Sequence, residues 1–417
     1  MQQAPRVALV TYAMHCGGME AFLLRLAPYL VKRGCAVDVI TTIERGEWFA
    51  RFSTYGIQAE HVSGAGTPRV FAPLLHSLRV GSRIIRGNYD VVFLNHARHA
   101  QAVLARLPER VVAIPILHND NPEIYDVGCA NPDAWNVAVA VSPKVAATAR
   151  VRVPHRPVLH FPSGVDLPDP ALWQRRKPAG RRLELLFVGR LEHRQKGVLY
   201  LPAIYRACLD RGLDAALTII GDGPDAAELH RQLAEAGLRD RARHLTGLTP
   251  EQVYGRMLDS HILIMPSHYE GLPIALLESL ACGCVPVVSR LPGITDTVLE
   301  DGSTGFLVNV GDVAGFATAV AALQDDPIRW SEMSKAGHAR AAAAFSVEAM
   351  GRRYLELIHD ALQGRYPLPR PRKDQRALAL GVFPWREFVP APVRRLGRQG
   401  RSWLSAGSAA LRPRARH

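Results

Sequence analysis

The chain contains 417 residues, of which 48% are hydrophobic, and its formal net charge is +13 at pH 7. A chain of this length suggests two or three domains and easily builds a sizeable core. The charge is concentrated in residues 365–417, where twelve Arg and one Lys face two acidic residues, so residues 1–364 carry a net charge of only +2. A nearly neutral body argues against a nucleic-acid-binding body and confines the basic character to the tail.

The cysteine pattern and the hydropathy pattern indicate the cellular compartment of the protein. Six cysteines are scattered along the chain, and the closest two, Cys282 and Cys284, lack the spacing of a zinc or thioredoxin site. The apolar residues 7–12 form too short a run, with too few basic neighbours, for a signal peptide. No uncharged run approaches the roughly 20 residues of a membrane span. We therefore expect a reduced chain in the cytoplasm.

In the first half of the chain, short apolar runs alternate with helical stretches. The runs that we expect to be strands are residues 6–13, 36–41, 56–62, 90–94, 111–117, 137–141 and 158–161. Strands that alternate with helices predict a parallel sheet. Gly17 and Gly18 precede a helix expected over 19–32, where they would allow close backbone approach and leave free N–H groups at the positive end of the helix dipole. Many such turns carry glycine for geometry only, so both readings stay open.

Three histidines follow successive strands of this predicted sheet. His96, His99 and His118 fall at strand carboxyl ends, where the loops of an open α/β sheet form the ligand crevice. A single histidine at such a place is more often structural. Three of them leave a structural and a functional role equally open.

A change of composition divides the chain. Residues 168–182 are rich in Pro, Arg and Lys and lack periodicity, so we place an interdomain linker there, between a first domain over 1–167 and a second over 183–345. In the second domain and beyond, we expect strands at 183–188, 216–220, 243–245, 261–265, 285–289 and 302–308, and helices at 225–236, 250–259, 273–283, 312–324, 327–345 and 347–362. A C-terminal helix over 346–364 then precedes a basic tail, 365–417.

Residues 267–289 form a strand–loop–helix–strand unit with two unusual carboxylates. Glu270 lies in the loop at the carboxyl end of a strand, and Glu278 borders the apolar stripe of the following helix. A buried carboxylate is costly unless something hydrogen-bonds to it, and the two hydroxyls of a sugar diol would serve. The alternative is that Glu278 reaches solvent or pairs with an arginine.

Two cations follow the strand at 183–188. Arg190 and Lys196 would converge at the same sheet edge as Glu270, and two cations there suit a diphosphate. The chain has no Asp-X-Asp metal signature, and two cations with helix N-terminal amides can neutralise a leaving diphosphate without a metal ion. The alternative is solvated surface charge.

Together these motifs resemble those of the large retaining glycosyltransferases of family 4, over nearly all of residues 6–362. The motifs that carry the resemblance are Gly17-Gly18, Ser163-Gly164-Val165-Asp166, Phe187-Val188-Gly189-Arg190 with Lys196-Gly197, Gly221-Asp222-Gly223-Pro224, and two glutamates separated by seven residues, Glu270 and Glu278. The resemblance implies an α/β protein of GT-B architecture. Two Rossmann-like domains would face each other across a cleft, and the C-terminal helix would return to the N-terminal domain.

The resemblance also implies a role for each matching position on the donor. Glu278 would bind the ribose hydroxyls of a nucleotide-sugar, and Glu270 would contact the donor sugar near the reacting carbon. Arg190 and Lys196 would hold the distal phosphate and stabilise the departing diphosphate. His118 would face the donor sugar from the other domain. The backbone of five donor-binding positions would cradle the phosphates or border them: Gly17, Gly18, Gly189, Gly271 and Leu272.

The implied activity is transfer of a sugar with retention, without a metal ion or other cofactor, to a glycan or lipid-linked acceptor in bacterial surface polysaccharide or glycolipid synthesis. A UDP-sugar is mildly preferred as donor, from the Glu-Gly-Leu-Pro form of the turn. Two departures stand out. Pro273 removes one amide where many members have Gly-Phe-Gly, and Leu94-Asn95-His96 stands where many have His-X-His.

Two other functions stay open from the sequence. One is a GT-B-fold sugar-nucleotide epimerase, and the other is a catalytically inactive scaffold that binds a partner through its tail. The tail mixes arginines with aromatic residues and prolines. It would be disordered in solution or would attach the enzyme to the anionic inner face of a membrane, where each basic residue contributes roughly 1 kcal/mol.

Overall fold

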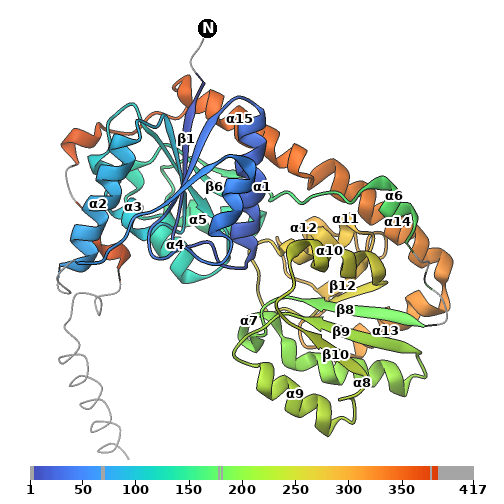
Figure 1. Ribbon diagram of the computed structural model, residues 1–417. Helices are drawn as coiled ribbons and strands as arrows, with labels where there is room; N and C mark the ends of the chain where they lie inside the picture. Colours follow the sequence, from blue (N-terminus) through green and yellow to red (C-terminus); the bar gives the residue numbers. More distant parts are fainter. Residues whose placement is uncertain (1–3, 67–70, 177–178, 180–181, 376–377, 384–417) are drawn as a thin grey trace, which may run out of the picture.

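Two parallel sheets organise the chain, as the computed structural model shows (Figure 1). The structure describes residues 4–66, 71–176, 179, 182–375 and 378–383. The first sheet has seven strands in the order β3-β2-β1-β4-β5-β6-β7. Its strands are β1 (Arg6–Thr11), β2 (Ala36–Thr41), β3 (Gln58–His61), β4 (Val91–Asn95), β5 (Val112–Leu117), β6 (Ala138–Ala140) and β7 (Val158–His160).

Helices cover both faces of this sheet. They are α1 (Gly18–Lys32), α2 (Ala72–Arg86), α3 (Arg98–Ala102), α4 (Pro122–Gly128) and α5 (Pro143–Arg152), with short 3-10 helices η1 (Phe49–Tyr55), η2 (Leu104–Arg106) and η3 (Pro132–Ala134). The central strands β4 and β5 are buried along their whole length, which is why their sequences are apolar up to Asn95 at the end of β4. The edge strand β3 is only partly buried and carries polar residues.

The second sheet has six parallel strands in the order β10-β9-β8-β11-β12-β13. Its strands are β8 (Leu183–Val188), β9 (Ala215–Ile220), β10 (Ala242–Leu245), β11 (Ile262–Met265), β12 (Val285–Ser289) and β13 (Phe306–Val308). Its helices are α7 (His193–Lys196), η4 (Val198–Tyr200), α8 (Leu201–Asp210), α9 (Ala226–Glu235), α10 (Pro250–Asp259), α11 (Ile274–Ala281), α12 (Thr295–Val298), α13 (Val313–Asp325) and α14 (Pro327–Ala344). Parallel strands with helical crossovers place the carboxyl ends of all strands at one edge.

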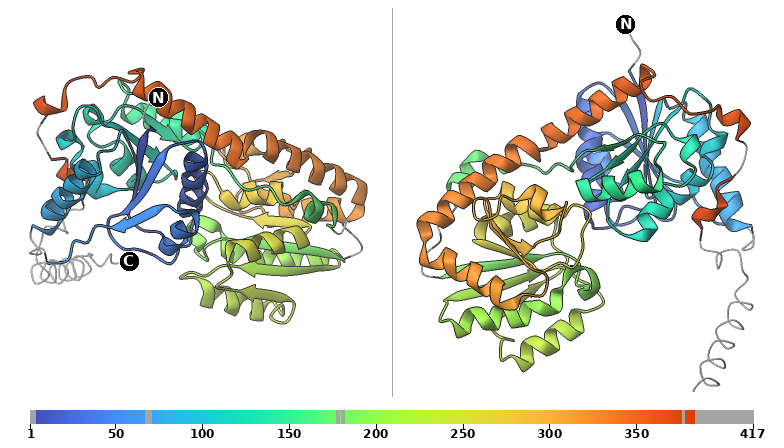
Figure 2. Two further views of the ribbon diagram at one scale, coloured as in Figure 1. Left: turned by 45° about the horizontal axis from the view of Figure 1, so that its top comes forward. Right: turned by 180° about the vertical axis from the view of Figure 1, so that it is seen from behind.

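The last long helix, α15 (Val347–Leu362), returns from the second domain to the first (Figure 2). Tyr354 packs its ring on Phe22 of α1 and on Phe93 of β4, with ring centroids 5.5 and 5.6 Å apart. One apolar cluster of buried residues includes side chains of α1, α11 and α15. The two domains therefore share apolar contacts, and the expected return of the C-terminal helix is confirmed.

The crossover segment contains a helix that the sequence did not predict. In residues 168–182, α6 (Pro170–Gln174) begins where Asp169 accepts a hydrogen bond from the backbone N–H of Ala171. Five residues are too few to show helical periodicity, which explains why this helix was missed. After α6, the Arg176 side chain donates to Ser334 Oγ at 2.7 Å and so ties the segment to α14.

The beginning of the basic tail packs against the first domain, whereas disorder was one of the two forms expected for 365–417. Arg372, in η5 (Arg372–Asp374), is 1% exposed and donates to three backbone carbonyls of the first domain, at 2.8–3.0 Å. After η5, η6 (Leu380–Val382) leads to Phe383, which lies on the ring of His99. Arg372 therefore satisfies carbonyl groups of the N-terminal domain. The rest of the tail, 384–417, lies outside the described residues.

Within the described ranges, no helix combines the length and the apolar character needed to cross a membrane. The six cysteines are free thiols, and all but Cys16 are buried.

Candidate active site

A buried ion pair occupies the loop at the carboxyl end of β11. The Glu270 side chain is 4% exposed, and Lys196 Nζ donates to both of its carboxylate oxygens, at 2.7 and 2.9 Å. Ser267 Oγ adds a hydrogen bond at 2.8 Å. The structure thus brings together two of the predicted site residues, which lie 74 positions apart in the chain, and it holds Glu270 in one orientation.

Glycines hold the loops of β8 and β11 together around this pair. Gly197, with φ +63°, follows Lys196, and a Cβ there would lie 1.9 Å from the carbonyl oxygen of Pro266. Gly221, at the end of β9, approaches Gly189 equally closely. Only glycine fits such contacts, so these positions keep the three loops in register.

Arg190, the second predicted cation, has a different environment. Its side chain is 68% exposed, and its nearest carboxylate is that of Glu192, at 3.6 Å. Burial and the carboxylate of Glu20 raise the pKa of Tyr12 in the N-terminal domain, and the charge of Arg190 opposes this shift. The Arg190 guanidinium is therefore largely exposed and is not tied to a buried partner among the described residues.

The two domains touch at two of the predicted glycines. A Cβ on Gly18, at the start of α1, would lie 3.0 Å from Ile274, the first residue of α11. A Cβ on Gly271 would lie 2.2 Å from the carbonyl oxygen of His118. The Gly271-Leu272 turn, which we expected to offer amides to a phosphate, thus also packs against the N-terminal domain.

His118 lies at the carboxyl end of β5 with its ring in a buried setting. Its Nε2 is 2.8 Å from Asn95 Oδ1, and its ring packs 5.0 Å from that of Phe22. Burial, with a smaller effect of His96, lowers the pKa of His118 to about 3. His118 is therefore neutral at ordinary pH and can offer hydrogen bonds but no charge.

The other two histidines of the predicted crevice, His96 and His99, have different neighbours. His96 Nε2 lies 3.4 Å from Glu123 Oε1, and its ring packs edge-on to Tyr12. His99 instead packs against His76, with ring centroids 4.0 Å apart, and against Phe383 of the tail segment. Position at a strand end therefore did not by itself predict the surroundings of a histidine.

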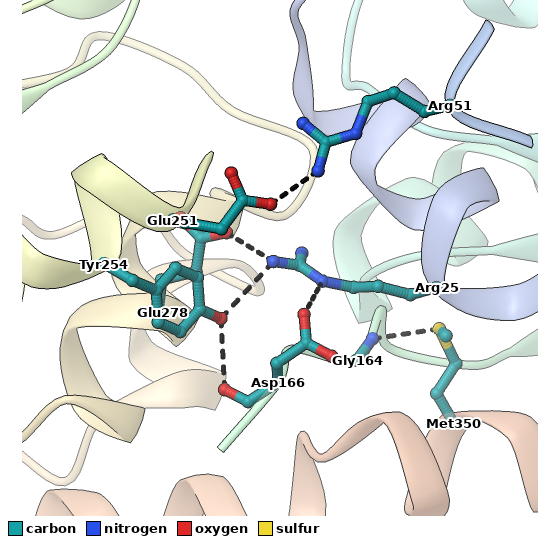
Figure 3. A network of polar contacts seen from close by, with 8 residues as sticks. All are labelled: Arg25, Arg51, Gly164, Asp166, Glu251, Tyr254, Glu278 and Met350. Carbon is teal, nitrogen blue, oxygen red and sulfur yellow. Dashed lines mark hydrogen bonds and ion pairs between the residues drawn. The ribbon is translucent and has the colours of Figure 1, made fainter. Parts of the chain in front are cut away.

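Glu278 is held by an arginine from the other domain (Figure 3). Its side chain is 13% exposed, and its Oε1 accepts a hydrogen bond from Arg25 Nη2 at 2.7 Å. Arg25 also donates from Nε to Asp166 Oδ2 at 2.8 Å. Burial raises the pKa of Glu278, and the charge of Arg25 opposes this shift. Pairing with an arginine, the alternative considered for Glu278, is therefore present.

Arg25 is the member of the site that sequence reasoning missed. It stands in α1 among the apolar residues Phe22, Leu23 and Leu26, which are all buried. A single arginine within the apolar stripe of an amphipathic helix signals a buried partner. That signal was available, but the identity of the partner requires the tertiary structure.

Among the described residues, no group of three or more His, Cys, Asp or Glu side chains is arranged to hold a metal ion. The polar groups gather instead around α11, with Glu270 before its first turn and Glu278 within it.

Two Rossmann-like domains with parallel sheets, joined by a C-terminal helix that returns to the first domain, define a GT-B glycosyltransferase fold. The Glycosyltransferase Family 4 model matches residues 16–168, and the Glycosyl transferases group 1 model matches residues 172–340. The chain belongs to glycosyltransferase family 4, as its sequence motifs indicated, and the expected transferase class is confirmed.

Relatives and solved structures extend over most of the chain. D-inositol 3-phosphate glycosyltransferase of Geodermatophilus obscurus is 30% identical over 383 residues, covering 80% of this chain and 82% of that one. The enzyme of the same name from Arthrobacter sp. (strain FB24) is 27% identical over 389 residues, covering 83% and 90%. The crystal structure of Anabaena HepE in complex with UDP and glucose superposes with a TM-score of 0.71 at 17% identity, covering 85% of this chain and 100% of that chain.

Proposed function

We propose that the protein transfers a sugar from a nucleotide-diphosphate sugar to a glycan or lipid-linked acceptor, with retention and without a metal ion. The donor is preferably a UDP-sugar, and the setting is bacterial surface polysaccharide or glycolipid synthesis on the cytoplasmic side. The observation that carries the proposal is the buried Lys196–Glu270 pair, which stands at the carboxyl edge of the sheet directly before the helix of Glu278.

The roles of the donor-side residues follow from their chemistry. Lys196 and the accessible Arg190 neutralise the diphosphate as its bond to the sugar breaks, which is the largest charge change in the reaction. Glu270, held by Ser267 and Lys196, accepts hydrogen bonds from the donor sugar. Glu278 accepts the ribose hydroxyls. The leaving phosphate oxygen takes the proton of the acceptor hydroxyl, so that no side-chain nucleophile is needed.

The N-terminal domain supports an acceptor rich in hydroxyl groups. The loops after β1 and β2 carry His15, Glu44 and Glu47, with both ring nitrogens of His15 within 2.9 Å of the two carboxylates. Tyr12 donates to the buried carboxylate of Glu20. Carboxylates accept hydrogen bonds from hydroxyl groups and repel phosphate, so this face suits a neutral part of a glycan.

Transfer is preferred to the two other functions considered. Relatives over most of the chain are named as glycosyltransferases, which favours transfer over epimerisation. Arg190, Lys196, Glu270 and Glu278 are all present, which argues against an inactive scaffold.

The deciding experiment combines ligand binding with product analysis. Thermal shift with UDP, GDP and ADP, and then with their sugar conjugates, identifies the donor. Incubation of that donor with EDTA and candidate glycans should give an α-configured glycosidic product from an α-donor, observed by NMR. Conversion of the nucleotide-sugar into its epimer without any acceptor would support the epimerase instead, and failure of every donor to bind would defeat the proposal.

We also propose that residues 384–417 attach the enzyme to an anionic membrane surface. The proposal rests on their composition: seven Arg and no acidic residue lie between Val393 and His417. Removal of 384–417 leaves the packed segment around Arg372 in place and should abolish sedimentation with phosphatidylglycerol vesicles. Unchanged sedimentation would refute the attachment.

A further inference from the structure

Arg25 joins three parts of the chain that belong to different structural units (Figure 3). It projects from α1 of the N-terminal domain, two turns after Gly18, and its side chain is 8% exposed. Its partners are Asp166 in the crossover segment, Glu278 in α11, and the hydroxyl of Tyr254 in α10, at 3.3 Å.

Asp166 belongs to the place where the two connections between the domains meet. The preceding residue, Val165, accepts a backbone hydrogen bond from Val347 and donates one to Phe345, at 3.1 and 2.7 Å. A Cβ on Gly164 would lie 2.7 Å from the carbonyl oxygen of Ser346, so the two segments cross in close contact. The motif at 163–166, which had no assigned role, thus forms the interdomain crossover and presents Asp166 to Arg25.

Only one of the two carboxylate oxygens of Glu278 accepts a hydrogen bond from a described residue. Arg25 binds its Oε1, and no hydrogen bond from a described residue reaches Oε2. Arg25 can therefore stay in place while the other oxygen accepts a hydroxyl group of a ligand. Burial by itself would favour the neutral form of a carboxyl group, which is a poorer acceptor.

We propose that Arg25 is a positioning residue for the donor, which holds the carboxylate of Glu278 as an anion, directs it toward the nucleotide ribose, and links this arrangement to the interdomain crossover through Asp166. The inference rests on the proposed function, because it assigns Glu278 to the ribose. Since Arg25 and Glu278 come from different domains, the arrangement exists only while the domains are together.

The test measures the affinity for UDP and for GDP by calorimetry at pH 6.0, 7.0 and 8.5. For the nucleotide that the wild type binds, Arg25→Ala should weaken binding about tenfold at pH 7, and more at pH 6.0. The pH dependence arises because Arg25 opposes the upward shift of the Glu278 pKa, so its removal lets Glu278 take up a proton at higher pH. The groups that face Glu278 are Arg25, Asp166, Tyr254, Cys282 and Cys16.

A double-variant cycle separates this role from a merely structural one. If Arg25 acts through Glu278, Arg25→Ala should cost little affinity in a Glu278→Gln background, although each single change weakens binding. Additive losses would overturn the inference. Arg25→Lys should lose affinity severalfold, because an ammonium group cannot bridge two carboxylates as a guanidinium fork does. If Arg25→Ala fails to fold, as thermal unfolding would show, unchanged affinity in Arg25→Lys overturns the inference.

The chain offers a matched control in Arg51. It pairs across the same interface with Glu251 at 2.5 Å, but the two side chains are 31% and 68% exposed and neither bonds to Glu278. Arg51→Ala should therefore bind the nucleotide as the wild type does. If Glu278→Gln weakens binding while Arg25→Ala has no effect at any pH, this inference fails and the proposed function stands. If Glu278→Gln also has no effect, the assignment of the ribose site fails.

Discussion

Glu270, before α11, and Glu278, within it, each form an ion pair with a basic side chain, but the two pairs are built differently. Lys196 and Glu270 both belong to the C-terminal domain, and Ser267 and the glycine contacts of the β8 and β11 loops hold them together. Arg25 and Glu278 come from opposite domains. The first pair is therefore present in any arrangement of the domains, while the second exists only when they are closed.

This difference separates two tasks within one site. A pair that is fixed within a domain can neutralise charge as it develops, because it needs no rearrangement during the reaction. A pair that forms between domains can make donor binding depend on closure, which in turn excludes water from the reacting groups. We therefore expect changes at Lys196 to lower turnover and changes at Glu278 to lower nucleotide affinity.

The largest effect is expected at Lys196. Lys196→Ala removes a cation from the diphosphate and should lower kcat by roughly 10²-fold or more, on the scale of one lost transition-state contact. Steady-state kinetics with the identified donor measures this. The change also leaves Glu270 buried without its cation, which costs about 3–5 kcal/mol of stability in comparable pairs.

A second variant separates the chemistry from the stability loss. In Lys196→Ala/Glu270→Gln the buried charge is gone, so the midpoint of thermal unfolding should recover most of the way while kcat stays low. If kcat recovers together with stability, Lys196 acts only through the fold, and its assignment to the diphosphate is wrong.

The next largest effect distinguishes the two glutamates from each other. Glu278→Ala should weaken UDP binding roughly 10- to 100-fold, the range of about 1.5–3 kcal/mol for hydrogen bonds to a charged group. Glu270→Ala should change UDP binding little and weaken binding of the UDP-sugar, because it contacts the sugar. Calorimetry with both ligands gives the comparison, and equal effects of both variants on UDP would contradict it.

The sequence predicted the common location of Lys196 and Glu270, although not their pairing, and it did not identify the arginine that pairs with Glu278. Lys196 and Glu270 lie on short loops directly after strands, where the direction of the chain fixes the end of the sheet at which a residue lies. Each of the expected strands has a counterpart in the two sheets, so that inference was sound. Arg25 lies in the middle of a helix, and its partner depends on how the domains pack, which no local pattern contains.

The same limit explains the other differences. The resemblance to the family implied the return of α15, but the packing of the tail segment around Arg372 depends on carbonyl groups of distant loops. For Gly271, the turn was evident from the sequence, and the contact with the His118 backbone was not. Positions defined by the chain itself could thus be predicted, and positions defined by a partner surface could not.

A smaller effect is expected at an uncharged contact between the domains, that of Gly271 with the His118 backbone. Gly271→Ala places a methyl group against the His118 carbonyl oxygen, and relief of such overpacking costs typically about 1–3 kcal/mol. We expect turnover to fall about tenfold, with little change in the thermal midpoint of the C-terminal domain. Gly255→Ala, in α10, is the matched control, because its methyl group meets no atom of another element within 4 Å. Similar turnover in both variants would show that the contact does not matter for closure.

The smallest effect concerns His118 and is one of pH dependence. Its pKa is lowered to about 3 in the folded protein and is about 6.5 in an unfolded chain, so the unfolded state binds the extra proton between these values. Stability must then fall as the pH drops below about 6.5, by up to about 1.4 kcal/mol per pH unit from this group. His118→Gln should make the acid side of the stability–pH profile less steep by about one proton.

NMR checks the charge of the His118 ring directly. The His118 ring resonances are those missing from the spectrum of His118→Gln, and in the wild type they should not titrate between pH 5 and 8. The pKa of His99 is also lowered to about 3. His99→Gln should reduce the slope similarly but leave turnover unchanged, because the His99 ring packs against His76 of the first domain and Phe383 of the tail segment. Titration of His118 near pH 6 would show that its ring is charged in the fold, and it could then contribute charge as well as hydrogen bonds to the donor site.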